Sequence, residues 1–104
     1  SFATEEGDPE PAIVKRDDGS LLIAGWMQAD ELAEALGLVI PENRTYDTAA
    51  GFLIEAFGHL PAVGDHILLQ NWRFEVVDLD GRRVDKVLAS RPLVTTRGKK
   101  AART

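Results

Sequence analysis

Two apolar runs near the start of the chain predict a β-hairpin. Residues 12–26, AIVKRDDGSLLIAGW, place these runs on either side of Asp18 and Gly19. An Asp-Gly pair between apolar runs is a strong signal for a tight turn that joins two antiparallel strands. We therefore expect the two runs to pair with each other.

Three further strands are predicted in the second half of the chain. Residues 66–70 and 72–80, HILLQ and WRFEVVDLD, are apolar runs with Asn71 near the turn between them. The second run alternates, so Phe74 and Val76 fall on the same side of a strand. It is one strand of a second predicted hairpin.

A third turn precedes the last predicted strand. Asp80 and Gly81 form another Asp-Gly pair, and residues 84–90, VDKVLAS, follow it. The main apolar members of this strand are Val84, Val87 and Ala89.

A first helix is predicted over QADELAEALG, residues 28–37. Asp30 and Glu31 suit the positive N-terminal end of a helix, and Gly37 is placed to stop it. The residues expected to share its apolar face are Leu32, Ala35 and Leu36. The segment that follows, LVIPENRT, is predicted to be a loop, because Pro41 biases the residue before it away from helical geometry.

A second helix follows this loop and ends at Gly58. We expect Asp47 to be its N-cap, because a short carboxylate can accept hydrogen bonds from the amides of the first turn. Gly58 suits the left-handed residue that often ends a helix. A glycine inside the helix, Gly51, suggests a close crossing against the first helix or the sheet. The predicted apolar face consists of Ala50, Leu53, Ile54 and Phe57.

The predicted order of elements is β-β-α-α-β-β-β. Because strands and helices come in blocks, the pattern favours an α+β fold, with two helices packed on one face of a mostly antiparallel sheet.

Composition and charge narrow the class of protein. The chain has 104 residues, which is the size of one domain, and a formal net charge of -5. That charge argues against broad binding to nucleic acid, which needs a basic face. The sequence contains no cysteine, so disulfides and thiolate chemistry are excluded. No apolar run approaches the roughly 20 residues that span a bilayer.

The two ends of the chain differ in charge. Residues 1–12 are acidic and contain prolines, which is typical of a linker from an upstream domain. Residues 93–104 form a basic tail that we predict to be flexible, and a contact with anionic lipid or an acidic neighbour is the alternative. There is no signal peptide and no initiator Met, so we expect the chain to be a piece of a longer protein.

Few residues are candidates for chemistry. His59, Asp65 and His66 surround one turn and could bind a divalent metal, but their spacing does not aim them at one point and magnesium prefers oxygen ligands. We therefore predict ordinary loop residues and no metal. Ser20 and Ser90 have no histidine partner in a recognisable motif, so no catalytic residue and no enzyme activity are expected.

Two tryptophans and the sheet edges are candidates for protein contacts. Trp26 and Trp72 either pack within the fold or anchor a partner, since tryptophan is enriched at interface hot spots. A small antiparallel sheet also has two edges, either of which could pair with a second copy or with another domain.

Several fragments together resemble a known family. DGS, DEL, YDTAAGF, GHLPAVGD and RFEVVDLDGRR occur in this order within residues 13–92. Each fragment alone is weak, but together they resemble the CorC/HlyC transporter-associated domain. The motif residues, which we expect to be structural, are Asp18, Gly19, Tyr46, Asp47, Thr48, Gly51, Gly58, Pro61, Gly64, Asp65, Phe74, Asp80 and Gly81.

The resemblance implies a context that composition does not. Domains of this family sit in hemolysin-like membrane proteins with a transmembrane region and a pair of CBS domains, and are linked to magnesium and cobalt efflux. It implies a non-catalytic accessory domain at the cytosolic face of the plasma membrane. The expected partners are the CBS pair and transmembrane region of its own parent protein, and a second copy in a weak homodimer.

The resemblance also implies a fold grouped with PCMH-type flavin-binding domains. FAD is therefore a possible ligand by fold analogy only, and a flavin or adenine-nucleotide binding module is the alternative function. A phosphate cradle needs clustered glycines that lead into a helix, whereas the glycines of this chain are scattered. No cofactor is expected. The hemolysin label suggests a membrane-active toxin, which the lack of an amphipathic membrane helix disfavours.

Overall fold

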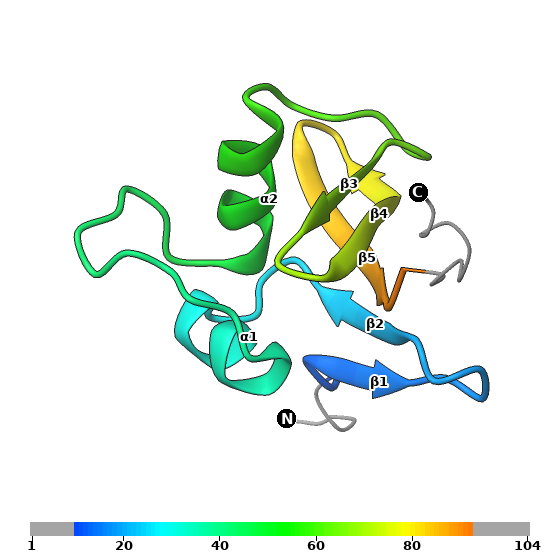
Figure 1. Cartoon of the computed structure of the whole chain (residues 1–104). Helices are drawn as coiled ribbons and strands as arrows, with labels where there is room; N and C mark the ends of the chain where they lie inside the picture. The colour runs from blue at the N-terminus through cyan, green and yellow to red at the C-terminus, as the bar shows by residue number, and fades with distance from the viewer. Residues whose placement is uncertain (1–9, 93–104) are drawn as a thin grey trace, which may run out of the picture.

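The computed structural model describes residues 10–92 and confirms the predicted α+β class and order of elements (Figure 1). In chain order the elements are β1 (Ile13–Lys15), β2 (Leu21–Ala24), α1 (Ala29–Leu36), α2 (Ala49–Phe57), β3 (His66–Leu69), β4 (Trp72–Asp80) and β5 (Arg83–Ser90). Each of the three Asp-Gly or Asn turns predicted from the sequence joins a pair of antiparallel strands.

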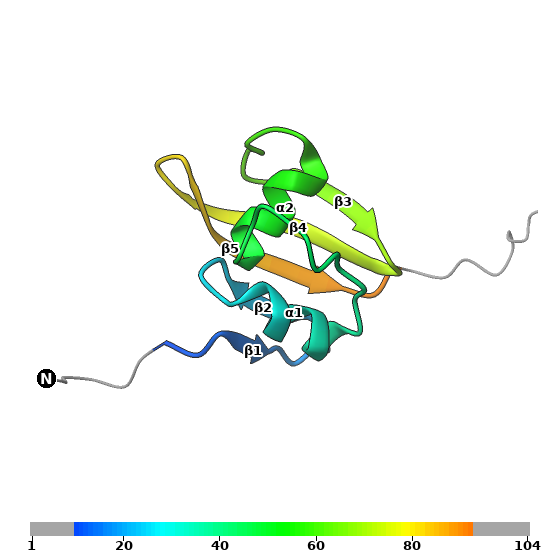
Figure 2. The same cartoon turned by 90° about the vertical axis from the view of Figure 1, so that its left-hand side faces the viewer.

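All five strands of the described part form one antiparallel sheet in the order β1-β2-β5-β4-β3. The β1–β2 hairpin therefore joins the other three strands through β5, with Leu22 opposite Leu88 and Ile23 opposite Val87. Both helices lie on the same face of this sheet (Figure 2). β3 and β1 are its two edges.

The core lies between the sheet and the two helices. Phe74 and Val76 of β4 are fully buried, as are Val84, Val87 and Ala89 of β5. The alternation along β4 is thus confirmed. A register shift near Asp78 interrupts the regular pairing of β4 with β5 toward the end of the strand. Burial of a Val- or Phe-sized side chain contributes about 1.5–3 kcal/mol to folding.

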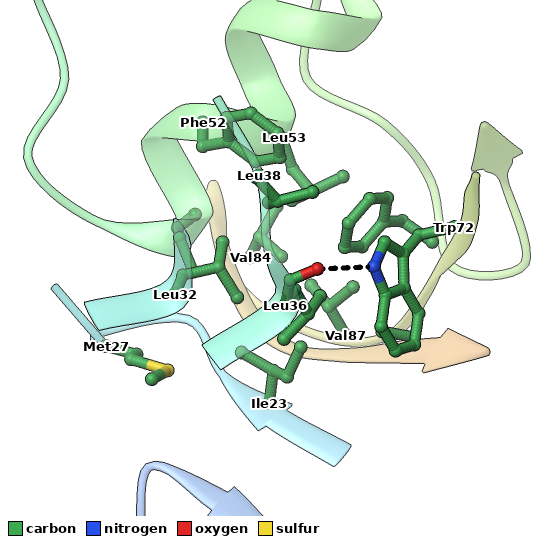
Figure 3. Close-up of a cluster of buried hydrophobic side chains, with 14 of the residues drawn as sticks. Ile23, Met27, Leu32, Leu36, Leu38, Phe52, Leu53, Trp72, Val84 and Val87 are labelled. Carbon is green, nitrogen blue, oxygen red and sulfur yellow. Dashed lines mark hydrogen bonds between the residues drawn. The ribbon is translucent and has the colours of Figure 1, made fainter. Parts of the chain in front are cut away.

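Trp72 belongs to this core. Its indole N–H donates to the carbonyl oxygen of Leu36, the last residue of α1, over 2.8 Å (Figure 3). The guanidinium carbon of Arg91 lies 3.9 Å from the centre of its ring, a cation–π contact. The packing interpretation of Trp72 is therefore confirmed, and the residue ties α1 to β4.

The apolar face of α1 is rotated relative to the prediction. Leu32 and Leu36 are buried, but Ala35 is exposed, and Ala29 is buried in its place. At 100° per residue, Ala29 and Ala33 extend the Leu32–Leu36 stripe on one side, whereas Ala35 falls on the other. The first of these sides is the buried one, so the prediction for Ala35 was wrong.

The face of α2 is broader than predicted. Ala50 and Leu53 are buried as expected, and Ile54 and Phe57 are partly buried. Phe52, which was not included, is also buried. A helix this apolar packs against both α1 and the sheet, so more than one stripe is covered.

The predicted linker and tail fall largely outside the described residues. All of residues 93–104 and most of residues 1–12 lie there. Of the linker, Glu10 forms an ion pair with Lys86 over 2.9 Å, and the carbonyl oxygen of Ala12 accepts from the Ala24 N–H over 2.8 Å. Neither helix of residues 10–92 is long and apolar enough to cross a membrane.

Candidate functional site

The most motif-rich stretch of the sequence, residues 46–66, begins at the N-terminus of α2. Thr48, not Asp47, is the N-cap: its hydroxyl oxygen accepts from the Gly51 N–H over 3.2 Å. Asp47 lies one residue further out, where its backbone carbonyl accepts from the Ala29 N–H over 2.8 Å. The prediction of Asp47 was wrong because Asp and Thr are both good N-caps, and only the start of the helix at Ala49 decides between them.

A short segment that links β2 to α1, residues 25–28, runs beside the start of α2. We call it the junction segment. Within it, the carbonyl oxygens of Gly25 and Met27 accept from the N–H groups of Ala50 and Ala49 over 2.9 and 2.8 Å. These bonds and the Thr48 cap occupy the amides that a helix N-terminus leaves free. α2 therefore has no free amides in its first turn with which to cradle a phosphate.

Gly25 is where the junction segment approaches β5 most closely. Its N–H donates to the carbonyl oxygen of Asp85 over 2.8 Å. A Cβ at this position would lie 2.0 Å from the carbonyl oxygen of Val84, which is backbone and cannot rotate away. Glycine is therefore required here by space, at a position outside the predicted set of motif residues.

Gly51 also has a spatial role, but not the one predicted. A Cβ at Gly51 would lie 2.7 Å from the Cβ of Tyr46, so the close contact is with the segment before α2 and not with α1 or the sheet. Tyr46 packs edge-to-face on Phe52, and Phe52 packs in the same way on Phe74, with 5.9 Å between ring centroids in both pairs. The motif YDTAAGF thus connects the interhelical loop to the core.

Arg44 holds the same loop from the other side. Its guanidinium donates to the carboxylate of Asp30 over 2.7 Å and to the carbonyl oxygen of Pro41 over 2.9 Å, and it lies 5.7 Å from the Tyr46 ring centroid. Its side chain is only 15% exposed. Arg44 was not among the predicted residues, because a lone arginine in a loop carries no signal of its partners.

The loop after α2 is built by turn residues. Gly58 ends the helix in the left-handed region, with φ of 82°, and donates its N–H to the Ile54 carbonyl oxygen over 2.9 Å. Pro61 is buried, and the Gly64 N–H donates to the Val76 carbonyl oxygen over 2.8 Å. The carboxylate of Asp65 accepts from the Ala62 N–H over 2.9 Å, so it closes the loop on itself.

The two histidines beside this loop are exposed, and each has different neighbours. His59 has its Nδ1 atom 3.2 Å from the Leu60 carbonyl oxygen and its ring against Phe57. His66 begins β3, opposite Glu75. Across residues 10–92 no three His, Asp or Glu side chains are grouped so that they could hold a metal ion. The structure therefore does not bring His59, Asp65 and His66 together as ligands.

The first hairpin turn shows local hydrogen bonding and no catalytic arrangement. Asp18 accepts from both the hydroxyl and the N–H of Ser20. These two bonds, the hydroxyl first, hold the pKa of Asp18 below its usual value of 3.8. Ser20 therefore directs its hydroxyl proton to a carboxylate within its own turn. Gly19 and Gly81 adopt positive φ at the turns predicted for them.

The remaining candidate, Trp26, lies in the junction segment and is 52% exposed. The packing interpretation thus applies to Trp72 and not to Trp26. No pocket is found in the part of the chain that the structure describes. What residues 46–66 offer is a set of backbone contacts that joins α2, the junction segment and β4.

Comparison with solved structures assigns this arrangement to a class of small domains. A transporter-associated domain from a Xylella fastidiosa hemolysin, solved in complex with Mg²⁺ and Mn²⁺, is 44% identical with a TM-score of 0.69, and the match covers 80% of this chain and 100% of that one. A domain from a CBS domain protein of Porphyromonas gingivalis is 29% identical with a TM-score of 0.62, over 76% of this chain and 95% of that one.

The sequence comparisons give the family itself. Residues 14–92 match the CorC_HlyC transporter associated domain, and the chain belongs to that family. A UPF0053 protein of Synechocystis is 39% identical over 86% of this chain and 21% of its own length. The polyamine export protein of Escherichia coli K12 is 34% identical over 79% of this chain and 19% of its own length. The chain spans about a fifth of these relatives.

Proposed function

We propose that this domain is a non-catalytic accessory part of a membrane transport protein and acts through contacts with other domains. The observation that supports it is the family match over residues 14–92, with relatives that include polyamine export proteins and a CBS domain protein. The motif residues make backbone and packing contacts within the fold, as expected of a rigid domain that acts through contacts with other domains. In this proposal the domain contacts its own CBS pair or a second protomer at the cytosolic face of the membrane.

The transported ion is a second part of the proposal. The resemblance suggests magnesium and cobalt efflux, whereas the E. coli relative is named for polyamine export. Polyamines, magnesium and cobalt are all cations, so the proposal is export of a multivalent cation by the parent protein. A transport assay should therefore measure all three.

Deletion of residues 13–92 from the full-length parent protein tests this proposal. We expect altered efflux of at least one of the three cations, with the truncated protein still inserted in the membrane. Gly25→Ala, which the structure predicts will unfold the domain, should reproduce the effect of the deletion. Gly19→Ala should not, because a Cβ at Gly19 meets no atom within 4 Å. Unchanged efflux after deletion would overturn the proposal.

A further inference from the structure

β3 is an edge strand whose outer side has no partner among residues 10–92. Its other side pairs with β4, with Ile67 opposite Phe74 and Leu69 opposite Trp72. Two observations fix which backbone groups face β4. Gln70 and Asn71 both have positive φ, which is typical of the tight two-residue turn that makes its flanking residues a hydrogen-bonded pair.

The second observation comes from the other end of β3. The Val76 N–H of β4 donates to the Asp65 carbonyl oxygen over 2.9 Å. Backbone direction alternates along a strand, so residues 65, 67 and 69 face β4. The N–H and C=O groups of His66 and Leu68 therefore point away from the sheet.

Exposed apolar side chains accompany this edge along its length. Leu68 lies on β3 itself and is 62% exposed, and Val63, in the turn just before it, is 58% exposed. Val39 is 82% exposed and is hydrogen-bonded to Gln70, the residue that follows β3. The side-chain amide of Gln70 accepts from the Val39 N–H over 2.8 Å and donates to the Val39 carbonyl oxygen over 3.0 Å. These are three of the five large hydrophobic residues that are exposed in residues 10–92.

The opposite edge of the sheet is protected in the usual ways. β1 has only three residues, and one of them is Lys15, with Arg16 directly after it. Lysine on an edge strand is one of the devices by which natural proteins prevent unwanted strand pairing, and with four residues β3 differs from β1 in this respect more than in length. β3 carries neither lysine nor proline and has no formal charge when His66 is neutral. The contrast indicates that the β3 edge is left open for a partner.

We propose that β3 pairs with β3 of a second copy of this chain, antiparallel and across a twofold axis at Ile67. In this register His66 of each copy faces Leu68 of the other, and their outward N–H and C=O groups bond one another. The two sheets then form one continuous sheet, in the manner of strand addition.

The edge complements itself, which is why the proposed occupant is a second copy. The outward groups belong to two residues placed symmetrically about Ile67, so a twofold axis matches every donor with an acceptor. The antiparallel register also brings Val63 of one copy to the end of β3 where Val39 of the other lies. No lysine, arginine, aspartate or glutamate lies on β3, whereas β1 ends in Lys15 and is followed directly by Arg16.

The size of the edge predicts a weak dimer. Interfaces that bury less than about 1,200 Å² in total are typically transient. A strand of four residues with its flanking turns falls in this class. Pairing would therefore be favoured when two copies are held close together, as in an oligomeric parent protein, where effective concentrations reach the millimolar range. The inference thus deepens the proposed contact function by naming the surface and partner.

Sedimentation equilibrium of the 104-residue chain over a wide concentration range tests the pairing. We expect a reversible monomer–dimer equilibrium. Leu68→Lys should weaken association by about tenfold or more, because it removes the apolar contact and places a charge in the edge. Val14→Lys is the matched control: it makes the same charge change at an exposed valine on the opposite edge strand and should leave the equilibrium unchanged.

Two results would overturn the proposal. One is a chain that remains monomeric at about 1 mM, where even a millimolar dissociation constant leaves a measurable dimer. The other is a dimer that Leu68→Lys and Val14→Lys weaken equally, since the interface would then lie elsewhere. Equal melting temperatures of the two variants verify that both are folded. Either result leaves the accessory function standing, because that function is tested by deletion in the parent protein.

Discussion

The junction segment and the β3 edge differ in how their backbone groups are used. At the junction segment, Gly25 bonds both β5 and α2, and the amides of Ala49 and Ala50 are occupied. At the β3 edge, the groups of His66 and Leu68 face outward. The motif residues Asp47, Thr48 and Gly51 lie beside the first of these places, whereas the exposed residues Val39, Val63 and Leu68 are not among the motif residues. The motif residues at the start of α2 therefore make contacts within the fold, and the surface that we propose for a partner lies elsewhere.

Of the predicted changes, Gly25→Ala should lower the free energy of unfolding the most. The new methyl group would lie 2.0 Å from the Val84 carbonyl oxygen, so β5 and the junction segment would have to separate. We expect a loss of about 3–5 kcal/mol in the free energy of unfolding, enough to unfold a domain of this size. Chemical denaturation followed by circular dichroism measures it. In Gly19→Ala, strain at a positive φ of 88° should cost only about 1–2 kcal/mol, and equal losses in the two variants would refute the role of Gly25.

Gly51→Leu should be the next most harmful change. A side chain here meets the Cβ of Tyr46 at 2.7 Å, and overpacking of this kind typically costs about 1–3 kcal/mol. Glu55→Leu is the control, because Glu55 is exposed one turn further along the same helix. The melting temperature should fall for Gly51→Leu and stay within a few degrees for Glu55→Leu. A wild-type melting temperature for Gly51→Leu would show that the segment around Tyr46 can move to accommodate the larger side chain without loss of stability.

Much of the fold was predictable because its signals are local. Asp18-Gly19 and Asp80-Gly81 mark hairpins, Gly37 and Gly58 mark helix ends, and alternation marks β4. Each signal acts within a few residues of itself, so no knowledge of the tertiary structure is needed to interpret it.

The errors and omissions arose where distant segments decide the outcome. Ala35 was placed on the wrong side because tertiary packing, which includes the contact between α1 and α2, selects the buried side of α1. Gly25 and Arg44 depend on Val84 and Asp30, which lie far from them in the sequence. The open edge of β3 could not be derived either, because the strand order that makes β3 an edge is set by the pairing of β2 with β5.

Thr48→Ala and Asp47→Ala separate the observed N-cap from the predicted one. Loss of an N-cap hydroxyl costs about 0.5–2 kcal/mol, so Thr48→Ala should lower stability by that amount. Asp47 is exposed and contributes its backbone carbonyl, which alanine retains, so Asp47→Ala should stay within about 0.5 kcal/mol of wild type. Urea denaturation of both variants measures these two losses of stability. The reverse order of stabilities would restore Asp47 as the cap.

The smallest predicted effect concerns the first hairpin turn and pH. The pKa of Asp18 is lowered in the folded state by hydrogen bonds from Ser20, so the ionised carboxylate stabilises the fold. That contribution is present above the ordinary pKa of 3.8 and is lost as pH falls through the lower folded-state pKa. Asp18→Asn should therefore melt slightly below wild type at pH 6, and the gap should close as pH falls below 3.8 and through the lowered folded-state pKa. A gap that is constant from pH 2 to pH 7 would exclude this linkage.

Amide hydrogen exchange, measured residue by residue at low and high protein concentration, tests the contrast most directly. The amides of Gly25, Ala49 and Ala50 should exchange slowly at both concentrations, because their bonds lie within one chain. The amides of His66 and Leu68 should exchange rapidly in the dilute chain and become protected as the concentration rises. His66 and Leu68 amides whose exchange rates do not depend on concentration would contradict the pairing of β3 with a second copy.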